Sequence, residues 1–350
     1  MSRSSAGSRP PDQPAEPAHP ADPARTTYYR TALVLDYHVH LWPHPQVADE
    51  TDLAVERLAQ YCESASAAGV TEIALTEHYN RFTKGRELVE GWWATEPNQD
   101  LRSYISHYFD HHATADLDRY VDTVVAAKAA GLPIVAGLEV DYYPGLMDKV
   151  GHFLDGYPFD VLLGSIHWLG TWMFDIFSEP VQMAEWDRRG TNPAWRSYAE
   201  AIEELAATGT CDVLAHPDLV KVTGRIADSG VVAEVEERIC EAAVSSGMAA
   251  ELSSAGFRKP IGEAYPSSSL LARLFSRGVP ITTASDTHGM AHLADRTPEL
   301  RELAAAAGYT ALRAFRGRKG YDVAFGAAPS QPESPAPEPG TDVSDSKSVP

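Results

Sequence analysis

The sequence predicts an α/β fold, a closed barrel of parallel strands joined by helices. Between residues 33 and 319, helical patterns alternate with short apolar runs, and Gly or Pro marks the turns between them. Seven of the apolar runs end in a polar cluster. A closed barrel gathers the carboxyl ends of all its strands at one face, whereas an open doubly wound sheet binds its ligand at one switch point. Seven contributing strand ends therefore favour the closed barrel.

The first apolar run, Leu33 to His40, carries His38 and His40 two residues apart. In a strand these two imidazoles leave the same face. Taken alone, they are either half of a metal site or a pair of hydrogen-bonded structural histidines beside Asp36. The remaining units follow in order, with helices near 52–68, 117–130, 195–207, 232–246 and 270–276, and strands near 70–76, 133–138, 159–166, 211–215, 248–252 and 279–284.

The later strand ends supply further residues of the types that ligate metals. They are His78, Glu139, His167, His216, Asp286 and His288. Imidazoles and carboxylates without a thiolate suit zinc, iron or manganese better than magnesium or calcium, which prefer oxygen ligands. Eight such residues exceed the needs of one ion, so we expect two or three divalent transition-metal ions, with Glu139 able to bridge two of them. Asp141, on the same strand face as Glu139, is expected to orient a ligand imidazole or to cap the loop.

The composition limits the partners of the protein. The 350 residues contain 29 Lys and Arg against 49 Asp and Glu, a net charge of −20, which argues against binding to nucleic acid or to an anionic membrane. The three cysteines, Cys62, Cys211 and Cys240, are widely spaced, which fits a reducing compartment. The sequence has no secretory signal and no apolar run long enough to span a membrane, so we expect a soluble cytoplasmic protein.

Both ends of the chain are expected to be disordered, because residues 1–26 and 327–350 are rich in Pro, Ser and acidic residues. The barrel domain is expected over 27–326. It contains an aromatic insertion at about 80–116, which would suit a lid over the site or a contact between copies of the chain. His107 and His111 lie four residues apart in this insertion, but without the glutamate of HExxH we expect a lid or packing role for the segment.

Six short motifs follow one another along the chain: DYHVH, TEH, GLEVD, GSIH, AHPD and SDTH. In sequence and order they resemble the motifs of the PHP (polymerase and histidinol phosphatase) family. The longer segments GLEVDYYPG, SIHWLGTWMFD, SSAGFRKP and AFRGRKG look most like its monofunctional histidinol-phosphate phosphatases. The resemblance covers about residues 33–319. It implies a distorted seven-stranded, TIM-like barrel with a trinuclear metal centre. TEH departs from the Asp-His form that is commoner at this motif, although the histidine is the ligand.

The resemblance also implies three ligand sets. His38 and His40 would hold one ion with Glu139 and Asp286, and Glu139 would bridge to a second ion. That second ion would be held by His167 and His216. A third would be held by His78, His288 and a histidine that follows the first motif, for which the candidate is His44. The spacing of His44 is tighter than expected, and its alternative is an exposed position in a Pro-rich loop.

Paired cations activate a shared water and clamp phosphoryl oxygens, so hydroxide held by the metals would attack phosphorus without a protein nucleophile. A phosphate group also attracts cationic side chains, because Arg offers it paired hydrogen bonds. Loops that follow the strands supply the candidates Arg258, Arg225, Arg81 and Lys259. The alternative for each is an exposed loop cation.

The expected function is hydrolysis of a small phosphorylated substrate, L-histidinol phosphate, to L-histidinol and phosphate in histidine biosynthesis. One alternative keeps the metal centre but changes the substrate to a nucleotide, a phosphodiester or a nucleic-acid end. Another is a metal-binding module without catalytic activity.

Overall fold

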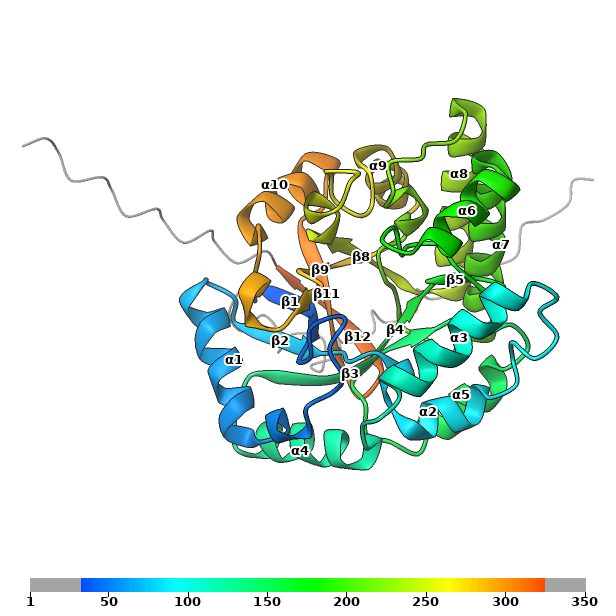
Figure 1. The fold of residues 1–350 in the computed structure, drawn as a ribbon. Coiled ribbons are helices and arrows are strands. Elements are labelled where there is room, and N and C mark those ends of the chain that lie inside the picture. The colour runs from blue at the N-terminus through cyan, green and yellow to red at the C-terminus, as the bar shows by residue number, and fades with distance from the viewer. Residues whose placement is uncertain (1–32, 325–350) are drawn as a thin grey trace, which may run out of the picture. The chain divides into compact units, whose positions relative to one another are not determined.

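The computed structural model describes residues 33–324, and the two predicted disordered tails lie outside this range. An eight-stranded parallel sheet curls around a common axis, with helices along its outer surface (Figure 1). Its strands run in the order β10, β1, β2, β3, β4, β7, β8, β9. Their bounds are Leu35–His40 (β1), Glu72–Leu75 (β2), Ile134–Asp141 (β3), Val161–Ser165 (β4), Val213–Leu214 (β7), Ala249–Ser253 (β8), Ile281–Ala284 (β9) and Thr287–His288 (β10).

Ten α-helices lie within the described range, and most of them connect successive strands. They are Val55–Ala67 (α1), Thr83–Val89 (α2), Gln99–His112 (α3), Leu117–Ala129 (α4), Met147–Leu154 (α5), Pro180–Arg189 (α6), Thr191–Thr208 (α7), Ser229–Ser246 (α8), Ser268–Ser276 (α9) and Thr297–Ala307 (α10). Glycine ends four of them, α6, α7, α8 and α10. Gly209 after α7 and Gly247 after α8 have φ values of 66° and 73°, a conformation that glycine adopts without a steric penalty.

The α/β class with a curled parallel sheet is as predicted, but the sheet has eight strands where seven were expected. The additional strand arises because the last strand path is interrupted at Ser285 and Asp286, between β9 and β10. The carboxylate of Asp36 on β1 accepts a hydrogen bond from the Ser285 amide (2.7 Å), and Asp286 has a φ of 49°. β10 and β9 stand at opposite ends of the strand order. They are consecutive in the chain and β10 pairs with β1, so the two ends of the sheet are joined at this break.

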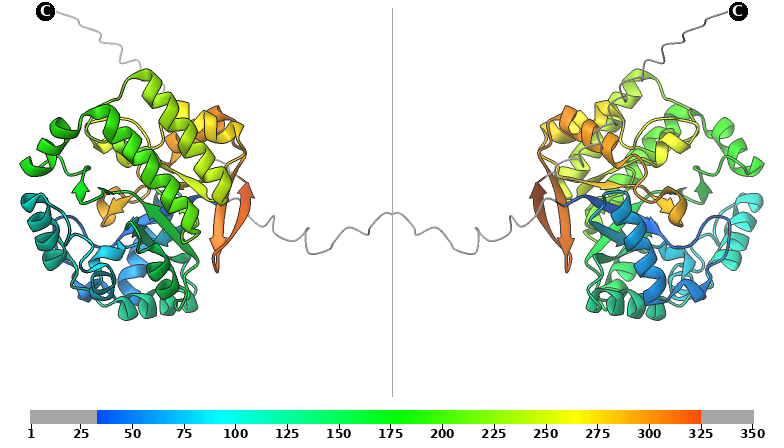
Figure 2. Two further views of the ribbon diagram at one scale, coloured as in Figure 1. Left: turned by 90° about the vertical axis from the view of Figure 1, so that its right-hand side faces the viewer. Right: turned by 90° about the vertical axis from the view of Figure 1, so that its left-hand side faces the viewer.

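A β-hairpin covers the amino ends of the strands. It consists of Ala311–Arg316 (β11) and Lys319–Ala324 (β12), and it lies at the opposite end of the barrel from α3 (Figure 2). Arg316 forms an ion pair with Glu72 at the start of β2. Arg318 pairs with Asp212, just before β7, and donates to the carbonyl of Thr210 (2.6 Å). This hairpin was not predicted from the sequence.

The three cysteines are buried and unpaired. Burial raises the pKa of the Cys211 thiol to about 12 and that of Cys62 and Cys240 to about 11, so all three remain protonated and unreactive. No helix within residues 33–324 is long and apolar enough to cross a lipid bilayer.

We predict that Arg318→Ala destabilises the protein by roughly 1–3 kcal/mol, because it leaves the largely buried Asp212 carboxylate without its cationic partner. The measurement is the free energy of unfolding in urea. Arg313→Ala is the control within the same hairpin, since Arg313 pairs with the exposed Asp322 and such a pair contributes about 0.5 kcal/mol or less. Equal effects of the two substitutions would contradict the role assigned to Arg318.

Candidate metal centre

The carboxyl ends of the strands bring the predicted ligand residues together. His38 and His40 lie on β1 and are fully buried, while His78 follows β2 and forms a parallel bridge with Glu139 on β3. His167 follows β4 and His216 follows β7, while Asp286 lies between β9 and β10 and His288 ends β10. His216 and Asp286 have positive φ values of 27° and 49°, and such backbone conformations in residues other than glycine concentrate at functional sites.

The first donor group surrounds one oxygen of Glu139. Its Oε2 lies 3.4 Å from His38 Nε2 and 3.6 Å from His40 Nε2. Asp286 Oδ1 lies 3.9 Å and 3.5 Å from the same two nitrogens. Ligands of a tetrahedral zinc ion with bonds of about 2.0–2.1 Å stand roughly 3.3–3.4 Å apart. The spacing of this group is therefore close to what one ion requires.

The second donor group faces the other oxygen of Glu139. Oε1 lies 3.6 Å from His167 Nε2 and 3.0 Å from His216 Nε2. Oε2 also lies 2.6 Å from His78 Nδ1. The two carboxylate oxygens thus point at different sets of imidazoles. This is the geometry required of a carboxylate that bridges two ions.

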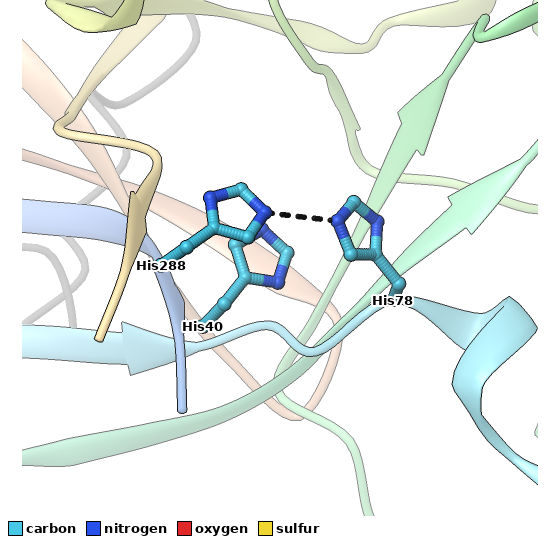
Figure 3. Close-up of side chains that lie close together, drawn as sticks. All are labelled: His40, His78 and His288. Carbon is cyan, nitrogen blue, oxygen red and sulfur yellow. Dashed lines mark hydrogen bonds between the residues drawn. The ribbon is translucent and has the colours of Figure 1, made fainter. Parts of the chain in front are cut away.

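The third donor group consists of imidazoles alone. His78 Nε2 lies 3.1 Å from His288 Nε2 and also 3.1 Å from His44 Nε2. Figure 3 shows His78 and His288 facing each other beside His40, whose ring centroid lies 4.2 Å from each of theirs. One ring nitrogen carries at most one hydrogen, so His78 Nε2 cannot donate a hydrogen bond to both partners. A shared cation would satisfy all three nitrogens.

Several ligand atoms in these groups are buried and have no hydrogen-bond partner. They include His38 Nε2, His40 Nε2 and Glu139 Oε2. Leaving such atoms unpaired costs free energy, and here they face one another as lone-pair donors. The residues therefore fit divalent ions, and a donor set of nitrogen and oxygen without sulfur fits zinc, iron or manganese.

The protonation states of three of these residues also suit ligation. Burial alone would raise the pKa of Glu139, but the surrounding histidines hold it well below its usual value, so the carboxylate is ionised. Burial lowers the pKa of His44 and of His288 well below the usual value, and the neighbouring histidines add to this shift. Both imidazoles are therefore neutral at pH 7, the form that binds metals.

Two carboxylates orient ligand imidazoles by accepting hydrogen bonds from their Nδ1 atoms. Asp141 accepts a hydrogen bond from His167 Nδ1 (2.6 Å), and Glu251 accepts one from His38 Nδ1 (2.7 Å). Such contacts fix the ring orientation and leave Nε2 to face the metal site. Asp141 was singled out in the sequence, whereas Glu251 was not. The available signal was a lone glutamate in the apolar run of β8, where it is fully buried.

The predicted phosphate-binding arginines are engaged with protein groups. Arg81 is fully buried and donates to the Gln46 carbonyl (2.7 Å) and to His44 Nδ1 (3.3 Å), so it holds the loop that carries His44. Arg225 pairs with Asp187 (2.7 Å) near the surface.

Arg258 supports the interrupted strand path. It pairs with Asp295 (2.7 Å) and donates to the carbonyls of Ser285 (2.7 Å) and Asp286 (3.1 Å). Of the four predicted cations, only Lys259 lines the cavity at the donor groups.

That cavity has a volume of about 430 Å³, the size of a small-molecule site. The donor groups form one end of it. Helix α3 and the segment after the short strand Trp172–Met173 (β6) form much of the remaining wall, with Tyr104, Tyr108, His112, Met173, Asp175, Ile176 and Phe177. The insertion therefore contributes a wall of the cavity. The metal-binding groups found among residues 33–324 do not include His107 or His111.

Fold and site together define an α/β-barrel protein whose strand ends carry clustered side chains that could bind metal ions. Residues 44–255 match the PHP domain, and the chain belongs to the PHP domain family. The family resemblance of the motifs is thereby confirmed.

Two relatives illustrate the similarity. A Deinococcus radiodurans protein named as a probable histidinol-phosphatase is 28% identical over 248 residues, which span 70% of this chain and 86% of the relative. The structure of histidinol phosphate phosphatase from Lactococcus lactis, in complex with zinc, L-histidinol and phosphate, superimposes with a TM-score of 0.59. The match covers 82% of this chain and 98% of that one at 21% identity, so it supports the fold.

We predict that Glu139→Gln lowers the metal content by about two ions per chain, because its carboxylate faces two donor groups. His288→Ala should remove about one ion, since His288 belongs to the third group. The measurement is elemental analysis after zinc loading and gel filtration. A Glu139→Gln protein with the same ion content as wild type would contradict the bridging role.

We predict that Glu251→Gln weakens metal affinity by roughly 10–100-fold, because His38 loses the acceptor that orients it. Competition with a chromogenic zinc chelator measures this change. Glu241→Gln, at an exposed position on α8, serves as the matched control and should leave the affinity unchanged. An equal affinity for the two variants would remove Glu251 from the support of the site.

Proposed function

We propose that the protein is a metal-dependent phosphomonoesterase that hydrolyses L-histidinol phosphate to L-histidinol and phosphate. The observation that carries the proposal is the position of Glu139, whose two oxygens face separate groups of imidazoles at the end of a small-molecule cavity. Two or three zinc, iron or manganese ions in these groups would suit hydrolysis of a phosphate ester. The names of the relatives support the same substrate.

The ligand assignment forms part of the proposal. The first set comprises His38, His40, Glu139 and Asp286, and the second comprises Glu139, His167 and His216. The third comprises His44, His78 and His288. When bound, such ions polarise a phosphoryl oxygen and lower the pKa of a water molecule toward neutrality.

The surrounding side chains then have separate tasks. Asp141 and Glu251 hold His167 and His38 in their orientations. Lys259 lines the cavity as a cation for the anionic substrate, while Tyr104 and Tyr108 cover it from α3 and exclude water. A role in histidine biosynthesis and a cytoplasmic location follow from this substrate.

We predict that the purified, metal-analysed protein releases phosphate from L-histidinol phosphate with a kcat/KM orders of magnitude above that for other phosphomonoesters, nucleotides or a phosphate diester. A colorimetric phosphate assay across this panel measures the preference. Removal of the ions by a chelator should abolish turnover, and added zinc or manganese should restore it.

His216→Ala provides the matched variant, with an expected loss of an ion and of nearly all kcat. If the ions are present but L-histidinol phosphate is inert, the substrate assignment is wrong. Turnover of the diester or a nucleotide would then indicate a phosphodiesterase.

A further inference from the structure

A carboxylate outside the three donor groups lines the cavity. Asp175 lies in the segment after β6, and its Oδ1 is shielded from solvent without a hydrogen-bond partner among residues 33–324. A buried carboxylate in this state is costly unless a partner neutralises it or donates to it.

Other largely buried aspartates of this barrel have such a partner. Asp160, Asp212 and Asp218 each pair with a Lys or Arg side chain, whereas Asp36 and Asp141 accept hydrogen bonds from backbone amides or from a histidine. Asp175 forms no ion pair within the described part of the chain, although Lys259 lines the same cavity. The cavity therefore presents an ammonium group and a carboxylate that do not neutralise each other directly.

This combination suits a ligand that carries charges of both signs. A simple alkyl phosphate would bring only negative charge toward Asp175, which opposes its binding. A phosphate ester with a protonated amine would place its phosphate at the donor groups and its ammonium at the carboxylate. Charge-assisted hydrogen bonds of this kind are roughly twice as strong as neutral ones.

The walls between these two ends are apolar and aromatic. Tyr104 of α3 lies 4.0 Å from Met173 (Oη to Sδ), so α3 and the segment that leads to Asp175 meet at the cavity. A carbon skeleton between phosphate and amine would contact these side chains. The cavity thus offers a place for each part of an aminoalkyl phosphate.

We propose that Asp175 receives the protonated amine of the substrate and thereby selects aminoalkyl phosphate monoesters over phosphates without an amine. This inference rests on the proposed phosphatase function and deepens it, because it assigns substrate selection to one side chain. Asp175 acts in recognition, and the reacting atoms lie at the donor groups.

The test compares L-histidinol phosphate with its deaminated analogue, 3-(imidazol-4-yl)propyl phosphate, on the zinc-loaded wild-type protein and on Asp175→Asn. For the wild type, kcat/KM should favour the amine substrate by roughly 10–100-fold. Asp175→Asn should lose most of this preference by slowing the amine substrate while leaving the analogue within about twofold. Asp122→Asn, at an exposed position on α4, is the control for the loss of one carboxylate and should keep the preference.

Two kinetic outcomes would overturn the inference while the proposed function stands. One is a wild-type protein that hydrolyses both esters equally well. The other is an Asp175→Asn protein that keeps the preference or loses both activities to the same extent.

Binding of the alcohol products separates failure of the inference from failure of the proposed function. Calorimetry with L-histidinol and 3-(imidazol-4-yl)propan-1-ol needs no turnover. If no phosphate ester is hydrolysed but L-histidinol binds the wild type more tightly than the deaminated alcohol, and Asp175→Asn abolishes the difference, the inference holds and the proposed function fails. Equal affinities of the two alcohols for the wild type overturn the inference whatever the activity.

Discussion

The site depends on the placement of one carboxylate, Glu139, between two groups of imidazoles. Removed from water, an ionised carboxylate is stable only where opposite charge or strong donors surround it. Here its two oxygens face His38 and His40 on one side and His167 and His216 on the other. The curled parallel sheet makes this arrangement attainable, because it directs several strand ends toward a common point.

A second layer of charged groups keeps the first in position. Glu77 accepts hydrogen bonds from the amides of Leu41 (2.5 Å) and Trp42 (3.0 Å), which fixes the chain directly after β1. Arg81 holds the next part of that loop, with His44, and Arg258 holds the carbonyls at the break between β9 and β10. The cations nearest to the donor groups in sequence thus serve the backbone more than the cavity.

The sequence was informative where a repeated pattern imposed the geometry. The alternation of helical patterns with apolar runs predicted the α/β class. Ligand-type residues at the ends of these runs predicted the convergence of His78, Glu139 and His216, because parallel strands share one direction. The sequence was less informative where a single side chain can contact any of several partners. A loop arginine such as Arg258 can reach a ligand or a carbonyl, and the choice depends on the loop conformation. Glu251 was missed because one glutamate in a strand has no periodic signature.

The break between β9 and β10 illustrates the same limit at the level of the fold. Asp36 on β1 accepts a hydrogen bond from the Ser285 amide on the adjacent strand path, a contact between residues that lie 249 positions apart in the chain. Short-range patterns in a sequence cannot predict such a long-range contact. The strand count therefore differed from the expectation although the class of fold did not.

The hairpin of β11 and β12 has a consequence for how small molecules reach the donor groups. Its ion pairs with Glu72 and Asp212 anchor it across the amino ends of the strands. The cavity at the donor groups lies at the carboxyl ends of the strands, with α3 as part of its wall. Under the proposed function, the ester, the alcohol and the phosphate would all use this cavity, so both products would have to depart before the next ester could bind.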